Sequence, residues 1–310
     1  MVGNAAGHAN PRGRAPEARL IGVGASTGAI TIVNALFTGV GCAAAIDLPV
    51  RVQVDLRVAA PGEPGSLHVP PESDSPLARA SALDAVHRFG GAREFDSRLW
   101  IESAIPPAAG LKSSSALGVA VGRAVASALG ATTSAQREAS ASAQVSRAVG
   151  LSATGAFDDA YAAAAGGIAL TENGTETVLA HGEADPDWVV LLWIPDGTHS
   201  PSPAWHARFR ELAEEAAPAV DAARDGRWLA ALERNSVLVE RALGVDRSAE
   251  RRRLAELGAL ASGVSGMGPA FASIVPRDLL PTLIRSHPGA GGDLRVAEFV
   301  RAGAPRGGSG

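Results

Sequence analysis

Four neighbouring residues, 112–115, carry side chains well suited to chemistry: one lysine followed by three serines. Lys112 is the only lysine among 310 residues, in a chain whose basic residues are otherwise arginines and histidines. An ammonium and several hydroxyls can donate hydrogen bonds to phosphate oxygens, and a hydroxyl can also ligate Mg²⁺. This group therefore predicts phosphate chemistry.

The surrounding elements would hold this group at the start of a helix. An alternating run around Leu99 and Ile101 predicts a strand over 98–105, and two prolines at 106 and 107 cannot continue its ladder. After a loop of small residues, apolar positions at near four-residue spacing predict a helix over 114–129: Leu117, Val121, Val125 and Leu129. The first N–H groups of a helix lack intrahelical partners and attract anions, so this arrangement suits phosphate.

Two other interpretations of residues 105–118 explain these residues less well than phosphate binding does. Serine is a favoured N-cap, so a well-capped helix explains one serine but not a triplet beside a glycine and the lysine. The Walker A pattern G-x-x-x-x-G-K-[ST] is not met, because Leu111 separates Gly110 from Lys112 and position 105 is isoleucine.

Two adjacent carboxylates, Asp158 and Asp159, stand at the start of an alanine-rich helical run. Neighbouring side chains on a helix point about 100° apart, so one acid can face a site while the other caps the helix or meets solvent. Such an acid would orient or deprotonate an acceptor hydroxyl. The alternative is that both acids simply complement the helix dipole.

Two more segments carry polar groups among small residues. Residues 25–48 set threonines and an asparagine between apolar residues, which is typical of a loop-lined pocket, although such groups also satisfy backbone in turns. Residues 262–270 form a second glycine loop. The acceptor-side candidates from these segments are Thr31, Asn34, Thr38, Ser265 and Gly266.

Composition limits the class of protein. A net charge of −4 without a basic block argues against nucleic acid as a partner. Cys42 is the only cysteine, so no disulfide forms within the chain, and a reducing cytoplasm is the expected location. No apolar run reaches about 18 residues, so no membrane partner is expected.

The order of elements predicts an α+β protein with two domains. Strands are expected at 19–24, 48–58, 188–194, 271–275 and 294–300, and helices at 77–89, 134–149, 204–217, 226–243, 248–261 and 277–286. The expected organisation is a disordered lead at 1–16, an N-terminal domain at 17–184, a C-terminal domain at 185–303 and a flexible tail at 304–310.

The central loop resembles the second motif of the GHMP kinases, the superfamily of galactokinase, homoserine kinase, mevalonate kinase and phosphomevalonate kinase. The matching residues are Pro107, Gly110, Leu111, Ser113, Ser114 and Ala116, while Lys112 stands where many members have glycine. Residues 154–167 and 262–270 resemble two further motifs in the family's order. Counting forward from Gly155 favours Asp158 as the acidic catalytic residue, and counting back from Gly166 favours Asp159.

The resemblance implies an ATP-binding N-terminal domain like that of ribosomal protein S5, followed by a ferredoxin-like domain. It implies that ATP is bound by the loop at Pro107, Ala108, Ala109, Gly110, Leu111, Lys112, Ser113, Ser114, Ser115 and Ala116. Mg²⁺ would be held by Ser114 and an acid, for which Glu138 is the only candidate on the helix before the aspartates. The Lys112 ammonium would reach the phosphates, or else would point into solvent.

Within the superfamily, the N-terminal run together with T-G-A-F-D-D-A and S-G-M-G-P-A is most similar to the archaeal-type shikimate kinases. That resemblance implies ATP-dependent phosphorylation of shikimate in chorismate and aromatic amino acid biosynthesis, by a monomer or homodimer. Another small alcohol, such as homoserine or a related cyclitol, remains an alternative acceptor. A sensor without turnover is a third alternative, against which the acid pair and the serine triplet count.

Overall fold

The computed structural model describes residues 19–196, 203–287 and 291–303. The expected lead at 1–16 and tail at 304–310 lie outside these ranges. The described chain has an α+β architecture with two sheets, which confirms the predicted fold class. The position of the boundary between the two domains, near residue 184, stays a prediction.

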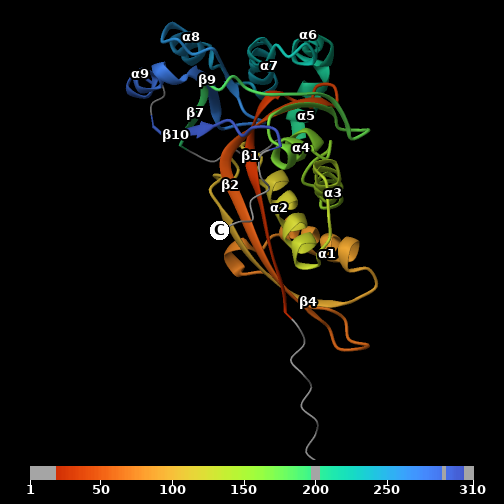
Figure 1. Ribbon diagram of the computed structural model, residues 1–310. Helices are drawn as coiled ribbons and strands as arrows, with labels where there is room; N and C mark the ends of the chain where they lie inside the picture. Colours follow the sequence, from red (N-terminus) through yellow and green to blue (C-terminus); the bar gives the residue numbers. More distant parts are fainter. Residues whose placement is uncertain (1–18, 197–202, 288–290, 304–310) are drawn as a thin grey trace, which may run out of the picture.

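The first sheet is built around one long hairpin, β1 with β2 (Figure 1). Its path runs β3-β4-β2-β5-β6, and β1 pairs with β2 off this path. The strands of this sheet are Leu20–Val33 (β1), Val40–Val58 (β2), Leu67–His68 (β3), Phe95–Ser103 (β4), Ile168–Glu172 (β5) and Thr177–Gly182 (β6). Over residues 47–54 of β2, exposed positions alternate with buried apolar ones, so one face of this part of the strand is buried and the other is solvated.

Strand β1 corrects the expectation of a loop after residue 24. Its pairing with β2 continues through a register shift between Thr27 and Gly28 and ends only at Val33. Small residues there serve close packing: a Cβ on Gly24 would lie 2.2 Å from the Ala120 carbonyl oxygen of the helix α2. The strand carries small residues because a helix lies directly against it, which periodicity alone does not reveal.

Helices cover one side of this sheet, as Figure 1 shows for α1 to α4. Helix α2 lies against β1 and β2, and α1, α3 and α4 pack around it. Their bounds are Pro76–Gly90 (α1), Ser113–Ala128 (α2), Ala135–Ala148 (α3) and Phe157–Ala165 (α4), with a short 3₁₀ turn at Pro71–Ser73. The layer thereby brings the start of α2 and the start of α4 onto the same side of the sheet.

The second sheet is antiparallel with the order β10-β7-β9-β8. Its strands are Trp188–Ile194 (β7), Ala261–Val264 (β8), Phe271–Pro276 (β9) and Asp293–Glu298 (β10). Numbered along the chain, these strands lie in the order 4-1-3-2, which is the ferredoxin-like arrangement that the resemblance implied. The accompanying helices are Pro203–Glu211 (α5), Ala213–Arg224 (α6), Trp228–Leu243 (α7), Ser248–Glu256 (α8) and Leu280–Arg285 (α9), with a 3₁₀ turn at Arg277–Leu279.

The two sheets share a hydrophobic core, and a backbone hydrogen bond also links the chain after β10 to β2. One hydrophobic cluster includes Ile30 and Val54 of the first sheet together with Leu192 and Ile274 of the second. The backbone N–H of Val300 donates to the Ala45 carbonyl over 3.0 Å. None of the described helices is long and apolar enough to cross a membrane.

Candidate active site

The serine triplet lies at the N-terminus of α2, as the sequence predicts. Lys112 is the N-cap residue and has a left-handed backbone conformation, with φ of 67°. The three serines differ in exposure: Ser114 is exposed, Ser113 is half-buried and Ser115 is buried. Ser114 is therefore the hydroxyl of the triplet most open to a ligand in solution.

The loop before α2 is pressed against the C-terminal glycine loop. Gly110 has φ of 82°, and a Cβ there would lie 2.3 Å from the Ser265 carbonyl oxygen. The Ser265 hydroxyl donates to the Gly110 carbonyl over 2.8 Å, and the Ala270 N–H donates to the Ala109 carbonyl over 3.0 Å. The two loops that resemble family motifs thus form one unit, and glycine is required at 110 by both conformation and space.

The other loop residues divide between core and surface. Ala109, Leu111 and Ala116 are buried and anchor the loop, whereas Pro107 and Ala108 are exposed. The buried side chains fix the loop to the core, and the exposed residues leave part of its backbone at the surface.

Asp159 contacts the loop before α2, and the contact is made by Lys112, the only lysine of the chain. Its Oδ1 lies 3.0 Å from Lys112 Nζ, and both side chains are nearly buried, with 12% and 11% exposed. Burial and the neighbouring Asp158 raise the pKa of Asp159 to about 7, although the Lys112 ammonium acts to lower this pKa. A carboxyl group with a pKa near neutrality is well matched to proton transfer at physiological pH.

Asp158 points to different partners. Its Oδ1 accepts a hydrogen bond from Asn173 Nδ2 over 2.8 Å, and its backbone N–H donates to Asn173 Oδ1 over 3.0 Å. Asn173 is fully buried in the segment after β5. The structure therefore separates the two acids that the sequence leaves equivalent: Asp159 meets the loop of α2, and Asp158 is engaged inside the protein.

Four of the five acceptor-side candidates are brought together. The Gly266 N–H donates to Thr31 Oγ1 over 2.8 Å, and the Thr31 N–H donates to Ser265 Oγ over 3.2 Å. Asn34 Nδ2 donates to the Gly266 carbonyl over 2.9 Å. A Cβ on Gly266 would lie 3.4 Å from Lys112 Nζ, which places this cluster beside the ion pair.

Thr38 is apart from the other candidates. It is exposed in the turn between β1 and β2, where its hydroxyl accepts a hydrogen bond from the Val40 N–H over 3.2 Å. Turn chemistry of this kind is the alternative that the sequence leaves open for the polar residues of this segment.

Two asparagines from other elements hold different parts of the site: Asn235 contacts Asn34, and Asn173 contacts Asp158. Asn235 of α7 is 1% exposed and accepts a hydrogen bond from the Asn34 N–H over 2.9 Å. Nothing in the sequence indicates that Asn173 holds Asp158, because Asn173 stands in an ordinary turn segment, Glu-Asn-Gly-Thr. Its contact with Asp158 depends on the pairing of β5 with β2, which only the fold reveals.

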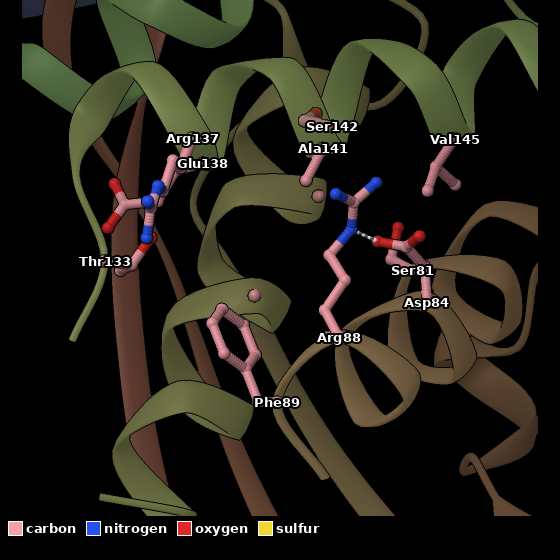
Figure 2. A pocket seen from close by; sticks show the side chains of 13 residues that line it. Ser81, Asp84, Arg88, Phe89, Thr133, Arg137, Glu138, Ala141, Ser142 and Val145 are labelled. Carbon is pink, nitrogen blue, oxygen red and sulfur yellow. Dashed lines mark hydrogen bonds and ion pairs between the residues drawn. The ribbon is translucent and has the colours of Figure 1, made fainter. Parts of the chain in front are cut away.

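Glu138 is held away from the serine triplet. Its Oε2 accepts hydrogen bonds from Arg123 Nε over 3.0 Å and Nη2 over 2.7 Å. Arg123 follows Ser114 by nine residues in α2, which corresponds to about 13 Å along a helix axis. Figure 2 shows Glu138 in a groove between α1, α2 and α3, opposite the pair formed by Arg88 and Asp84. The residues that line this groove do not include the serine triplet.

Comparisons with known proteins show the family of the chain. The family model described as "GHMP kinases N terminal domain" matches residues 77–167, which include the loop, α2 and both aspartates. The shikimate kinase of Methanosarcina mazei is 33% identical over 271 residues, which cover 87% of this chain and 91% of that protein. The shikimate kinase of Thermococcus kodakarensis is 36% identical over 250 residues, covering 80% of this chain and 90% of that protein.

Solved structures show the same fold at low sequence identity. Homoserine kinase from Cytophaga hutchinsonii superposes with a TM-score of 0.65 at 18% identity, covering 95% of this chain and 99% of that chain. Galactokinase from Lactococcus lactis superposes with a TM-score of 0.66 at 12% identity, covering 91% and 94%. The identity of 33% and 36% with two archaeal shikimate kinases, of which the chain covers 91% and 90%, shows that the chain belongs to their family within the GHMP kinase superfamily and is a phosphotransferase with an alcohol group as acceptor.

Proposed function

We propose that this enzyme is a shikimate kinase, which transfers the γ-phosphoryl group of ATP to a hydroxyl of shikimate and releases ADP and shikimate 3-phosphate. The observation that carries the proposal is the identity of 33% and 36% with two shikimate kinases over 87% and 80% of the chain. The juxtaposition of Lys112 with Asp159 supports phosphoryl transfer at this site.

The loop at 107–116 would bind the triphosphate of ATP. Catalysis of phosphoryl transfer consists mostly of positioning and of stabilising charge. The free N–H groups at the start of α2, with the Ser113 and Ser114 hydroxyls, are suited to phosphate oxygens. Buried Ser115 would contribute through its backbone and not through its hydroxyl. Lys112 supplies a compact cation at the same helix end, where it can neutralise negative charge that develops on the transferred group.

Asp159 would act on the acceptor. The ionised carboxylate can accept the proton of the attacking hydroxyl, or hold that hydroxyl in line with the phosphoryl group. Its pKa of about 7 leaves a large fraction ionised at neutral pH while keeping it basic enough to take a proton. The neighbouring cluster of Thr31, Asn34, Ser265 and Gly266 would form the acceptor side of the site.

The residues present fit a magnesium ion that arrives with ATP. Mg²⁺ usually takes only one or two protein oxygens and fills its shell with phosphate and water. The exposed hydroxyl of Ser114, at the start of α2, is an oxygen of that kind. Ser114 would be the protein ligand, and the ion would neutralise phosphate charge. Glu138, paired with Arg123, is a poorer candidate for a second ligand.

Mass spectrometry of the product tests the proposal. The enzyme is incubated with ATP, Mg²⁺ and shikimate, and in parallel with homoserine or quinate in place of shikimate. The expected result is a phosphorylated shikimate and stoichiometric ADP, with much slower product formation in the control variant Asp159→Asn. Phosphorylation of homoserine or quinate in preference to shikimate would overturn the acceptor assignment, and an absence of ADP with every acceptor would overturn the kinase assignment.

A further inference from the structure

Helix α4, which carries Asp159, lacks a capping side chain of its own. Its N-cap residue is Ala156, which has a left-handed conformation with φ of 53° and cannot accept a hydrogen bond through its side chain. Side chains from the N-cap position normally satisfy the free N–H groups of the first turn. In α4, Asn173 from the far end of β5 accepts the hydrogen bond of the Asp158 N–H instead.

The amide of Asn173 engages Asp158 at two points. A backbone N–H can only donate, so the atom that faces it is the amide oxygen, and the NH₂ group then faces the Asp158 carboxylate over 2.8 Å. The Thr171 hydroxyl donates to the same Asn173 oxygen over 2.8 Å. Asn173 and Thr171 are both fully buried, so their hydrogen bonds are sheltered from water.

The Asp158 carboxylate also fits a prepared space. A Cβ on Gly41 of β2 would lie 2.2 Å from Asp158 Oδ2. Glycine at 41 therefore leaves room for the second carboxylate oxygen, while Asn173 holds the first. The Asp158 side chain thus lies against Gly41 of β2 and is held by Asn173, which directly follows β5.

We propose that Asn173 and Asp158 form a clamp that sets the rotation of the first turn of α4, and that Asn173 is thereby a positioning residue for Asp159. Adjacent side chains on a helix are separated by about 100°, so fixing the direction of Asp158 also fixes that of Asp159. The clamp aims Asp159 at Lys112, which stands 3.0 Å away on the neighbouring helix. The inference rests on the proposed function in one respect, that Asp159 acts on the acceptor.

A double-mutant cycle tests the clamp. Asn173→Ala is made in the wild type and in Asp159→Asn, and kcat is measured with the acceptor that the product assay identifies. In the wild type we expect kcat to fall about 10- to 100-fold, because a misplacement of about 1 Å can cost that much. In Asp159→Asn the same substitution should change kcat less than about twofold, because the group that it positions is gone. Equal losses in both backgrounds would overturn the proposal.

Two further variants separate positioning from stability. Asp158→Asn keeps an oxygen to accept from Asn173 and should retain kcat within about tenfold above pH 8, whereas Asp158→Ala should match Asn173→Ala. Leu283→Ala, buried in α9 of the other domain, is the control for lost stability and should leave kcat of the folded enzyme unchanged. A fall in kcat with Leu283→Ala that matches its loss of stability would assign the Asn173 effect to folding.

A crystal structure of Asn173→Ala gives a readout that does not depend on the acceptor. The clamp predicts that the contact between Asp159 Oδ1 and Lys112 Nζ lengthens beyond the 3.0 Å of the wild type. An unchanged contact would overturn the clamp even if shikimate is the acceptor. A broken contact in an enzyme that phosphorylates a different alcohol would uphold the clamp and reject only the proposed substrate.

Discussion

Asp158 and Asp159 are chemically identical neighbours with opposite surroundings. Asp159 lies against the Lys112 ammonium, and Asp158 lies against the amide of Asn173. The pKa of Asp159 is raised first by burial and second by Asp158, and the lysine acts in the other direction. The pKa of Asp159 thus lies near neutrality, and the negative charge of Asp158 is one cause of that shift.

The first prediction concerns turnover by the two acids. Asp159→Asn should lower kcat about 10²–10⁴-fold, which is the usual contribution of a general base, with little change in ATP affinity. Asp158→Asn should cost much less, because an amide oxygen can still accept the hydrogen bond from Asn173. Steady-state kinetics of both variants measure the difference, and a greater loss with Asp158→Asn would reverse the assignment of the two acids.

The second prediction concerns the pH dependence of kcat/KM. In the proposed mechanism the ionised form of Asp159 is the base, so activity should fall below its pKa of about 7. Lys112→Met removes the cation that lowers this pKa, so the acid limb of the profile should move to higher pH. Asp158→Asn removes a like charge that raises the pKa, so its limb should move to lower pH. The expectation fails if the limb stays in place in both variants.

Lys112→Arg is the matched control for this profile. It keeps a positive charge near Asp159 and should leave the acid limb close to that of the wild type. It should still lower kcat, because a planar guanidinium does not replace a compact ammonium at this distance. The partial burial of Lys112 against Asp159 disfavours the alternative that its side chain simply points into solvent.

At the scale of elements, α2 is fixed at both its start and its middle. Its start meets the C-terminal glycine loop through Gly110 and Ser265. Its middle carries Arg123, which pairs with Glu138 of α3 and donates to the carbonyls of Ala25 on β1 and Ala164 on α4. Arg123 therefore ties three neighbouring elements to the helix that bears the serine triplet.

The third prediction separates stability from metal binding on α2. Glu138→Ala should lower the free energy of unfolding by about 3–5 kcal/mol, because it leaves a buried arginine without its carboxylate. The Mg²⁺ concentration for half-maximal activity should be unchanged in the folded variant. Denaturant unfolding and an Mg²⁺ titration measure these two quantities. A raised Mg²⁺ requirement would restore Glu138 as a ligand.

Ser114→Ala is the matched counterpart. Its hydroxyl is exposed, so stability should change by less than about 0.5 kcal/mol, whereas the Mg²⁺ requirement should rise and kcat should fall. An unaltered Mg²⁺ titration for this variant would remove Ser114 from the metal site.

At the scale of the whole molecule, the site lies where the two sheets meet. Thr31 and Asn34 come from β1 and the turn after it, Gly266 and Ser265 follow β8, and Asn235 comes from α7. Their mutual hydrogen bonds join the elements of the first sheet to those of the second. The residues proposed for the acceptor side are thus the same polar groups that hold these elements together.

The fourth prediction concerns this junction. Asn34→Ala deletes the hydrogen bond to the Gly266 carbonyl and the acceptor for the Leu36 N–H. We expect a loss of about 1–3 kcal/mol in unfolding free energy, which is the usual cost of buried groups left unpaired. KM for the acceptor should rise more than KM for ATP, because the triphosphate loop is untouched. Equal changes in both KM values would place the acceptor elsewhere.

Local pattern in the sequence determined the elements that are regular by themselves. The strand at 188–194 and the helices near 77–89 and 134–149 agree with β7, α1 and α3 to within about one residue. The glycine-serine loop before α2 could also be predicted locally. Two prolines end the strand, and small residues and serines then precede the helical spacing of the apolar residues in α2. The order of the elements supplied the α+β class, and resemblance to the GHMP kinases, carried by three motifs in order, supplied the folds of the two domains and the reaction class.

The tertiary structure decided everything that depends on partners distant in the chain. The extent of β1 and of β8 escaped prediction, because small residues look like a loop until a helix or a second strand lies against them. The β5–β6 hairpin was also missed, although the apolar residues on either side of Asn173 and Gly174 are a local hairpin signal. The choice between Asp158 and Asp159 was likewise undecidable from spacing. A helix carries both acids, but only the fold determines that Lys112 stands on one side of its first turn and Asn173 on the other.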